Sequence, residues 1–200
     1  AVHVADFAAL LAALAIPGPV DLCGFSFGGR IALAIAALRP ELVRRLVVTG
    51  VSAGRGALGR VIVRAWRAAL ATGDLETLAW QSLADTLGPT YLDRNEALLP
   101  AFVKATVERN TYAGVRALFE QTLDDSPAWP FHPTALAPTI TCPVLLLAGE
   151  HDRLAPAADL GALAAAFAGP VTHRVVPGVG HTVPIEAPEI WRDAVLGFLA

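Results

Sequence analysis

Methionine is absent from this 200-residue sequence, lysine occurs once, at Lys104, and cysteine occurs only twice. The two cysteines, Cys23 and Cys142, do not suggest a disulfide framework or a metal site, and we expect both to be small buried residues. The formal net charge of −3 and the lack of a basic patch argue against a nucleic-acid partner. No apolar run reaches about 18 residues, the length of a membrane helix. The apolar segment 5–16 lacks the basic leader of a secretory signal, so we expect a cytoplasmic protein with no membrane span.

Most of the chain is apolar, since 54% of its residues are hydrophobic and only 16% are charged. This composition can bury a large core, and the length fits one domain with room for an inserted subdomain. Short apolar runs predict buried strands at 19–23, 46–49, 143–148 and 171–176. Helical patterns cover 4–15, 29–38, 160–167 and 188–199. Strands that alternate with helices predict an α/β fold with a parallel sheet.

The pattern changes between residues 52 and 138, where helical spacing dominates and no convincing strand occurs. Helices are predicted there at 58–70, 75–87, 96–107 and 113–123, and four prolines mark a stiff return path. We therefore predict core parts at 1–51 and 139–200, separated by a helical insertion at 52–138.

The strand at 19–23 leads into a short glycine-rich turn. Its sequence is Gly24-Phe25-Ser26-Phe27-Gly28, which has the form G-x-S-x-G and is followed by a helix. A serine on a sharp strand-to-helix turn is a nucleophile elbow, which raises the hydroxyl above the sheet. The positive end of the helix, with the Phe27 N–H, favours an oxyanion at the same place. The turn is not a phosphate loop, because it lacks the required lysine and its intervening residues are aromatic.

A serine hydroxyl is a poor nucleophile until a base takes its proton, and the base needs a third group to orient it. Two later strand ends supply such groups: Asp152 follows the strand at 143–148, and His181 follows the strand at 171–176. In open α/β sheets, ligands bind at this edge. We take His181 as the base and Asp152 as the acid, with Glu150 as its nearest rival. The remaining histidines are predicted at the surface or in loops, with His132 as a candidate pocket residue.

Taken together, these residues resemble the α/β-hydrolase superfamily, and within it the cap-bearing serine esterases, lactonases and C–C hydrolases. The resemblance covers the elbow with its helix up to Pro40, residues 144–149 with Asp152, and Gly180-His181 with residues 184–188. It implies Ser26 as nucleophile, Asp152 and His181 as its partners, and a helical cap at 52–138 over the site. It also implies a reaction without a metal or an organic cofactor.

The sequence departs from the superfamily at its N-terminus. Members usually have several strands before the elbow, and the sequence lacks methionine at position 1. This predicts a fragment, or part of an assembly such as a homo-oligomer, in which another segment covers the open apolar edge of the elbow strand. The absent strands would carry a second oxyanion donor. Because losing one donor typically costs about 10²–10³ in kcat, we expect the isolated chain to be weakly active or inactive.

Aromatic residues predict a hydrophobic substrate pocket. The candidates are Phe25 beside the elbow and, in the insertion, Trp66, Trp80, Phe102 and Trp129; the arginines of the insertion, Arg55 among them, are candidates for binding a substrate carboxylate. The leading hypothesis is a serine hydrolase that cleaves a carboxylic ester, a lactone or a related small acyl compound. Two alternatives stay open: a non-catalytic or degenerate hydrolase-like binding protein, and an acyltransferase of the same fold.

Overall fold

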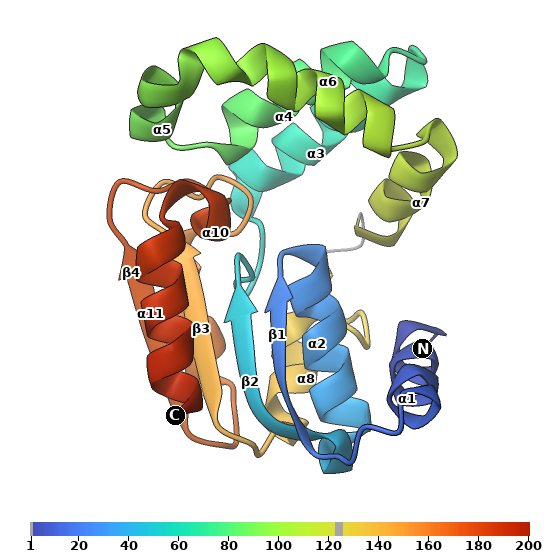
Figure 1. Ribbon diagram of the computed structural model, residues 1–200, viewed down its shortest axis with the longest axis vertical. Coiled ribbons are helices and arrows are strands. Elements are labelled where there is room, and N and C mark those ends of the chain that lie inside the picture. Colours follow the sequence, from blue (N-terminus) through green and yellow to red (C-terminus); the bar gives the residue numbers. More distant parts are fainter. Residues whose placement is uncertain (1, 123–125) are drawn as a thin grey trace.

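A parallel sheet of four strands forms the centre of the molecule (Figure 1). The computed structural model describes residues 2–122 and 126–200. The strands lie in the order β1-β2-β3-β4 and comprise β1 (Val20–Phe25), β2 (Val43–Thr49), β3 (Val144–Gly149) and β4 (Val171–Val176). Each neighbouring pair is parallel. The predicted α/β fold with a parallel sheet is therefore confirmed.

β3 and the second half of β2, residues 46–49, have the apolar character that burial on both faces requires, whereas the first half of β2 carries Arg44 and Arg45. Every residue of β3 is buried, and Leu46 of β2 pairs in register with Val144 of β3. β1 lies at one edge of the sheet, as the sequence predicts for the elbow strand. The expectation that both cysteines are buried is wrong, because Cys23 on this edge strand is exposed and Cys142 is only half-buried.

Helices cover both faces of the sheet (Figure 1). One face packs against α2 (Phe27–Leu38), α8 (Pro133–Leu136) and α9 (Leu160–Ala165), and α1 (Val2–Ala13) packs against α2. The other face packs against α11 (Pro188–Leu199), through Trp191 and Val195. The main core joins Leu33 of α2 to Leu46 and Leu146 of the sheet, all of them fully buried. Short connections are η1 (Pro40–Leu42), η3 (Ala137–Thr139), η4 (Ala157–Asp159) and α10 (Val183–Glu186).

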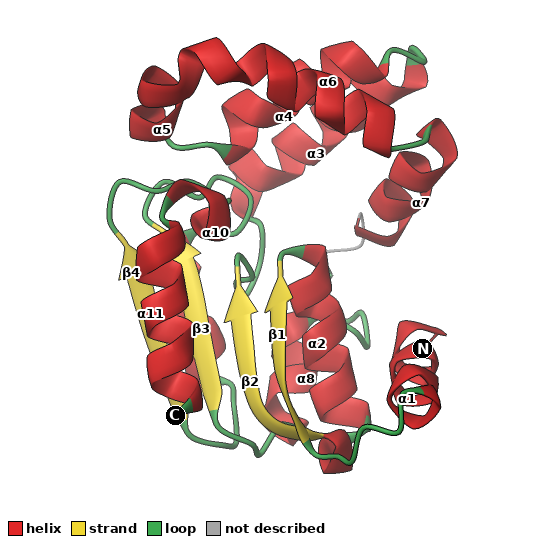
Figure 2. Ribbon diagram, in the orientation of Figure 1, coloured by secondary structure: helices red, strands yellow, loops and turns green. Residues whose placement is uncertain are grey.

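A group of helices lies beyond the carboxyl ends of the strands, at the top of Figures 1 and 2, and we call it the helical layer. It comprises α3 (Gly56–Ala71), α4 (Leu75–Thr86), α5 (Pro89–Asn95), η2 (Glu96–Leu98), α6 (Leu99–Arg109) and α7 (Tyr112–Thr122). Apolar residues of α3, α4 and α7, including Trp66, Leu78 and Phe119, pack into a core of its own.

The helix predicted at 96–107 has a different start, because α6 begins at Leu99 with Pro100 in its first turn. Proline lacks the N–H that a helix interior uses, so it is tolerated only near a helix start. The helix predicted at 113–123 corresponds to α7, and residue 123 lies outside the described residues. Over residues 2–122 and 126–200, each helix is too short or too polar to cross a membrane.

Candidate active site

Ser26 forms the turn between the end of β1 and the start of α2. Its backbone has φ 51° and ψ −116°, a strained conformation that non-glycine residues adopt mainly at functional sites. The Ser26 N–H donates to the carbonyl of Thr49 on the neighbouring strand, at 2.8 Å. A Cβ at position 24 would lie 2.6 Å from the carbonyl oxygen of Gly28, so the turn requires Gly24. The local sequence thus builds the predicted elbow.

The structure brings Ser26, His181 and Asp152 together. The Ser26 hydroxyl lies 2.8 Å from His181 Nε2, and His181 Nδ1 lies 2.8 Å from Asp152 Oδ2. When Nδ1–H donates to the carboxylate, Nε2 is left as the acceptor for the serine hydroxyl. Both His181 and Asp152 are buried, with 5% and 6% of their surfaces exposed, and burial strengthens such polar contacts.

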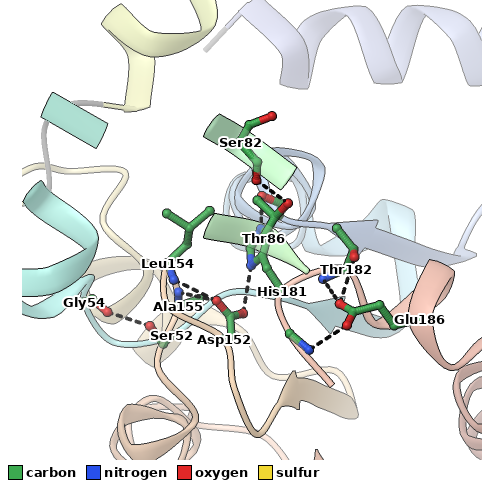
Figure 3. Close-up of polar contacts among 12 residues, drawn as sticks. Ser52, Gly54, Ser82, Thr86, Asp152, Leu154, Ala155, His181, Thr182 and Glu186 are labelled. Atoms are coloured by element: carbon green, nitrogen blue, oxygen red, sulfur yellow. Dashed lines mark hydrogen bonds and ion pairs between the residues drawn. The ribbon is translucent and has the colours of Figure 1, made fainter. Parts of the chain in front are cut away.

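The second carboxylate oxygen fixes Asp152 to its own loop (Figure 3). Oδ1 accepts hydrogen bonds from the N–H groups of Leu154, at 2.9 Å, and Ala155, at 2.8 Å. Because each oxygen has separate donors, the carboxylate cannot rotate away from His181 without losing hydrogen bonds. Glu150, the rival acid, is exposed and instead accepts from the Gly178 N–H at 2.8 Å.

The loop that carries His181 also contacts the helical layer (Figure 3). The His181 N–H donates to the carbonyl of Thr86 at the end of α4, at 2.7 Å. On the side of the sheet, the Phe25 ring packs against the imidazole, with ring centroids 5.2 Å apart. The imidazole is therefore positioned by the Phe25 ring at the end of β1 and by the hydrogen bond between the His181 N–H and Thr86.

A cavity of about 100 Å³ opens beside Ser26 and His181. The elbow residue Phe27 lines it, and α3 and α7 of the helical layer contribute Val63, Trp66, Leu118 and Phe119. The Trp66 and Phe119 rings are stacked, with centroids 5.9 Å apart. Trp66 Nε1 donates to Asp85 at 2.8 Å, which leaves its apolar face for the cavity. The cavity thus has the polar groups of Ser26 and His181 on one side and apolar side chains of α3 and α7 on the other.

The other predicted aromatic residues lie elsewhere. Trp80 is exposed on α4, and Phe102 lines a separate cavity between α4, α6 and Ile185. Trp129 lines an adjoining cavity of about 230 Å³, which shares Phe27 with the cavity beside Ser26. Of these three, the structure brings none to the walls of the cavity beside Ser26. Trp80 and Phe102 are on helices and Trp129 is in the turns before α8, and the sequence alone does not fix which of these side chains faces Ser26.

Polar groups at the site include two arginines. Arg30 and Arg55 line the cavity, and Arg55 donates to the carbonyl of Thr122 at 2.9 Å. His132, predicted at the surface or in a loop and as a candidate pocket residue, lies in the loop just before α8 but is buried, and its ring accepts from the Thr134 N–H at 3.3 Å. Among the residues that the structure describes, no group of three or more His, Cys, Asp or Glu side chains is arranged to hold a metal ion.

A family model described as the Alpha/beta hydrolase family matches residues 1–194. The chain belongs to the alpha/beta hydrolase family. The predicted superfamily is thereby confirmed, and Ser26, Asp152 and His181 of this family member all lie within the matched range.

Two kinds of relatives support this assignment. This chain is 25% identical over 183 residues to the Pyrrolizixenacetamide deacetylase of Xenorhabdus hominickii. The aligned part makes up 90% of this chain and 65% of that protein. It therefore spans less than two thirds of the length of this curated relative. A hydrolase from Pseudomonas aeruginosa superposes with a TM-score of 0.80 at 26% identity, over 98% of this chain and 70% of that one. An esterase from Thermogutta terrifontis superposes with a TM-score of 0.81 at 21% identity, again over 98% and 70%, and so shares the fold.

Proposed function

We propose that this alpha/beta hydrolase is a serine hydrolase that cleaves a carboxylic ester, a lactone or a related small acyl compound through an acyl-enzyme. The observation that carries the proposal is the pair of 2.8 Å contacts that join Ser26 to His181 and His181 to Asp152. A nucleophile, a base and an orienting acid in hydrogen-bond contact are the arrangement that acyl transfer requires. The deacetylase relative, whose name indicates removal of an acetyl group, supports the same class of chemistry.

The reaction follows from these contacts. Ser26 Oγ attacks the acyl carbon while its proton passes to His181 Nε2, and Asp152 stabilises the imidazolium. The developing oxyanion accepts a hydrogen bond from the Phe27 N–H, which has no acceptor within α2 because it opens the helix. The imidazolium then gives its proton to the leaving alcohol or amine. Water then attacks the acyl carbon while its proton passes to His181 Nε2. His181 returns this proton to Ser26 Oγ as the acyl–Ser26 bond breaks and the acid is released.

The helical insertion at 52–138 serves as a cap in this proposal. Its α3 and α7 supply the apolar walls beside Ser26, which suit an acyl group. The cavity of about 100 Å³ is small, which favours a short acyl group or a small ring. Of the aromatic residues that the sequence proposes for substrate binding, Trp66 lines this cavity, as does the proposed Arg55. Phe25 acts through its contact with His181.

The test is covalent labelling of the full-length protein with a fluorophosphonate probe, followed by mass spectrometry of the modified peptide. We expect the label on Ser26 in the folded protein and none in Ser26→Ala. Ser82→Ala is the matched control, since Ser82 is on α4 with its hydroxyl bonded to the carbonyl of Ala79, and it keeps the label. A folded protein that leaves Ser26 unlabelled contradicts the proposal.

A second measurement separates hydrolysis from transfer. With an activated ester and an added alcohol, a hydrolase releases mainly the free acid, whereas an acyltransferase yields mainly the new ester. We expect the free acid as the main product.

A further inference from the structure

Glu186, at the end of α10, accepts four hydrogen bonds on its carboxylate, and Figure 3 shows it beside Thr182. Oε2 accepts from the N–H groups of Gly88, at 2.7 Å, and Gly180, at 3.0 Å. Oε1 accepts from the Thr182 N–H at 3.1 Å and from the Thr182 hydroxyl at 2.9 Å. Both oxygens are therefore engaged, and hydrogen bonds to an ionised acceptor are stronger than neutral ones.

Two of these donors flank His181 in the sequence. We call residues 180–182 the base loop. Its three consecutive N–H groups all have acceptors: those of Gly180 and Thr182 donate to Glu186, and that of His181 donates to Thr86. The loop at 180–182 is thus fixed on both sides of the base. Glu186 itself does not touch the Ser26 hydroxyl or the cavity, so its influence on the reacting atoms passes through the loop.

The remaining donor, Gly88, belongs to the helical layer, 98 positions away in the sequence. The two backbones approach so closely that a Cβ on Gly180 would lie 2.5 Å from the Gly88 nitrogen and 2.6 Å from the Thr86 oxygen. Real Cβ atoms do not come this close to backbone atoms, so the contact excludes side chains. The turn between α4 and α5, residues 86–88, therefore sits directly on the base loop.

We propose that Glu186 is a positioning residue for His181, and that through Gly88 it couples the placement of the α4–α5 turn to the activity of the base. This rests on the proposed function, in which His181 is the general base. A loop that shifts by about 1 Å moves the imidazole out of range of Ser26, and misplacement of that size can cost about 10²-fold in rate. Through the contact between Gly88 and Glu186, the cap therefore helps to align His181, in addition to forming walls of the substrate cavity.

The principal experiment compares Glu186→Ala and Glu186→Gln with Glu189→Gln in hydrolysis of p-nitrophenyl acetate. Glu189 is an exposed glutamate three positions away and serves as the matched control. We expect kcat to fall about 10–100-fold in Glu186→Ala, less in Glu186→Gln, which keeps one oxygen acceptor, and not at all in Glu189→Gln. KM stays within about two-fold, because the cavity walls are unchanged.

A second variant tests the coupling without touching the carboxylate. A Cβ at Gly88 would lie 2.8 Å from Glu186 Oε2 and 2.9 Å from the Gly180 nitrogen, so Gly88→Ala pushes the two segments apart. We expect a similar loss of kcat in Gly88→Ala. In the double variant with Glu186→Gln the losses are less than multiplicative, because both changes act on one contact.

A readout independent of turnover is the NMR signal of the His181 Nδ1 proton, which reports its hydrogen bond to Asp152. We expect this signal to shift or broaden in Glu186→Ala and to match wild type in Glu189→Gln.

If the wild-type protein is not labelled at Ser26 but the His181 signal responds to Glu186→Ala, the proposed function fails and the positioning role stands. If folded Glu186→Ala and Gly88→Ala keep wild-type kcat and an unchanged His181 signal, the positioning role is wrong. A loss of kcat that only follows the fraction of unfolded protein, with an unchanged His181 signal, overturns it as well.

Discussion

The hydroxyl of Ser26 lies 2.8 Å from Nε2 of His181, although 155 positions separate the two residues in the sequence. The contact forms because the elbow after β1 and the loop after β4 both end at the carboxyl edge of the same parallel sheet. In such sheets this edge is where polar side chains from distant parts of the chain converge.

Asp152→Asn gives the sharpest test of the role of the acid. The asparagine keeps the shape of the side chain but favours the wrong tautomer of His181, so we expect kcat for an activated ester to fall about 10⁴-fold. The rate of fluorophosphonate labelling at Ser26 falls in parallel. A decrease of less than tenfold in a folded variant would mean that Asp152 does not orient the base.

Leu118 on α7 is suited to a test of the cavity, because it is half-buried and lines the wall beside Ser26. Leu118→Ala enlarges the cavity, and we expect the ratio of kcat/KM for p-nitrophenyl butanoate over acetate to rise about tenfold, since one methylene in a pocket is worth about 1–3 kcal/mol. Leu118→Phe lowers the ratio. Leu196→Ala, at an exposed position on α11, leaves it unchanged. Equal ratios in all three variants contradict the cavity as the acyl site.

Thr49 ends β2 and is fully buried, and its hydroxyl accepts from Trp191 Nε1 on α11 at 3.0 Å. Thr49→Val keeps the volume but leaves the indole N–H without this acceptor, so we expect the free energy of unfolding to fall by about 1–3 kcal/mol. Thr172→Val, at an exposed position on β4, changes it by less than about 0.5 kcal/mol. Urea unfolding measures the free energy of unfolding of both variants. An equal decrease in the two would mean that the hydrogen bond to Trp191 is not the cause.

Asp74 caps α4 and gives the chain a predicted pH dependence. Hydrogen bonds from Thr77 hold the pKa of Asp74 below its ordinary value of 3.8, so the charged form contributes stability above that pH. Asp74→Asn removes the charge but keeps an acceptor. We expect wild type to be more stable than the variant at about pH 6, and the difference to vanish as the pH falls from about 4 through the lowered pKa. Urea unfolding at several pH values tests this, and a difference that is constant with pH contradicts it.

Gly24 and Gly161 offer a matched pair of glycine substitutions. A Cβ at Gly24 would meet backbone atoms at 2.6 and 2.7 Å, whereas a Cβ at Gly161, in α9, has no heavy atom within 4 Å. We expect Gly24→Ala to destabilise the fold by about 1–3 kcal/mol or more and to abolish labelling of Ser26. Gly161→Ala adds about 0.5–1 kcal/mol of stability through helix propensity. Thermal unfolding and probe labelling separate the two outcomes.

The sequence predicts the elements whose side chains follow a strong local pattern. The continuous apolar runs of β2 and β3 predict central strands, and the carboxyl ends of successive parallel strands predict that Asp152 and His181 share one edge with Ser26. These predictions need only the chain order and the geometry of a parallel sheet.

The orientation of the helical layer is not predictable in this way. Trp66 and Trp80 are both aromatic residues on helices, yet one lines the cavity and the other is exposed. The bond from Gly88 to Glu186 depends on how α4 sits on the base loop, which no local pattern encodes. No local signal marks Glu186 either: it stands four positions after the N-cap Thr182, instead of the three of a capping box, and the Thr182 side chain makes no capping hydrogen bond.

Within the helical layer, the cavity wall and the support of the base come from different helices. α3 and α7 bound the cavity, whereas residues 86–88 rest on the loop of His181. This separation indicates which segments can be exchanged in chimeras with related proteins. If the proposed function holds, exchange of 56–71 together with 112–122 is expected to change the walls of the cavity while it leaves the contacts of 86–88 with His181 and Glu186 in place, provided that the exchanged α3 keeps its packing on α4. A graft that includes 86–88 has to bring a matching loop at 180–182.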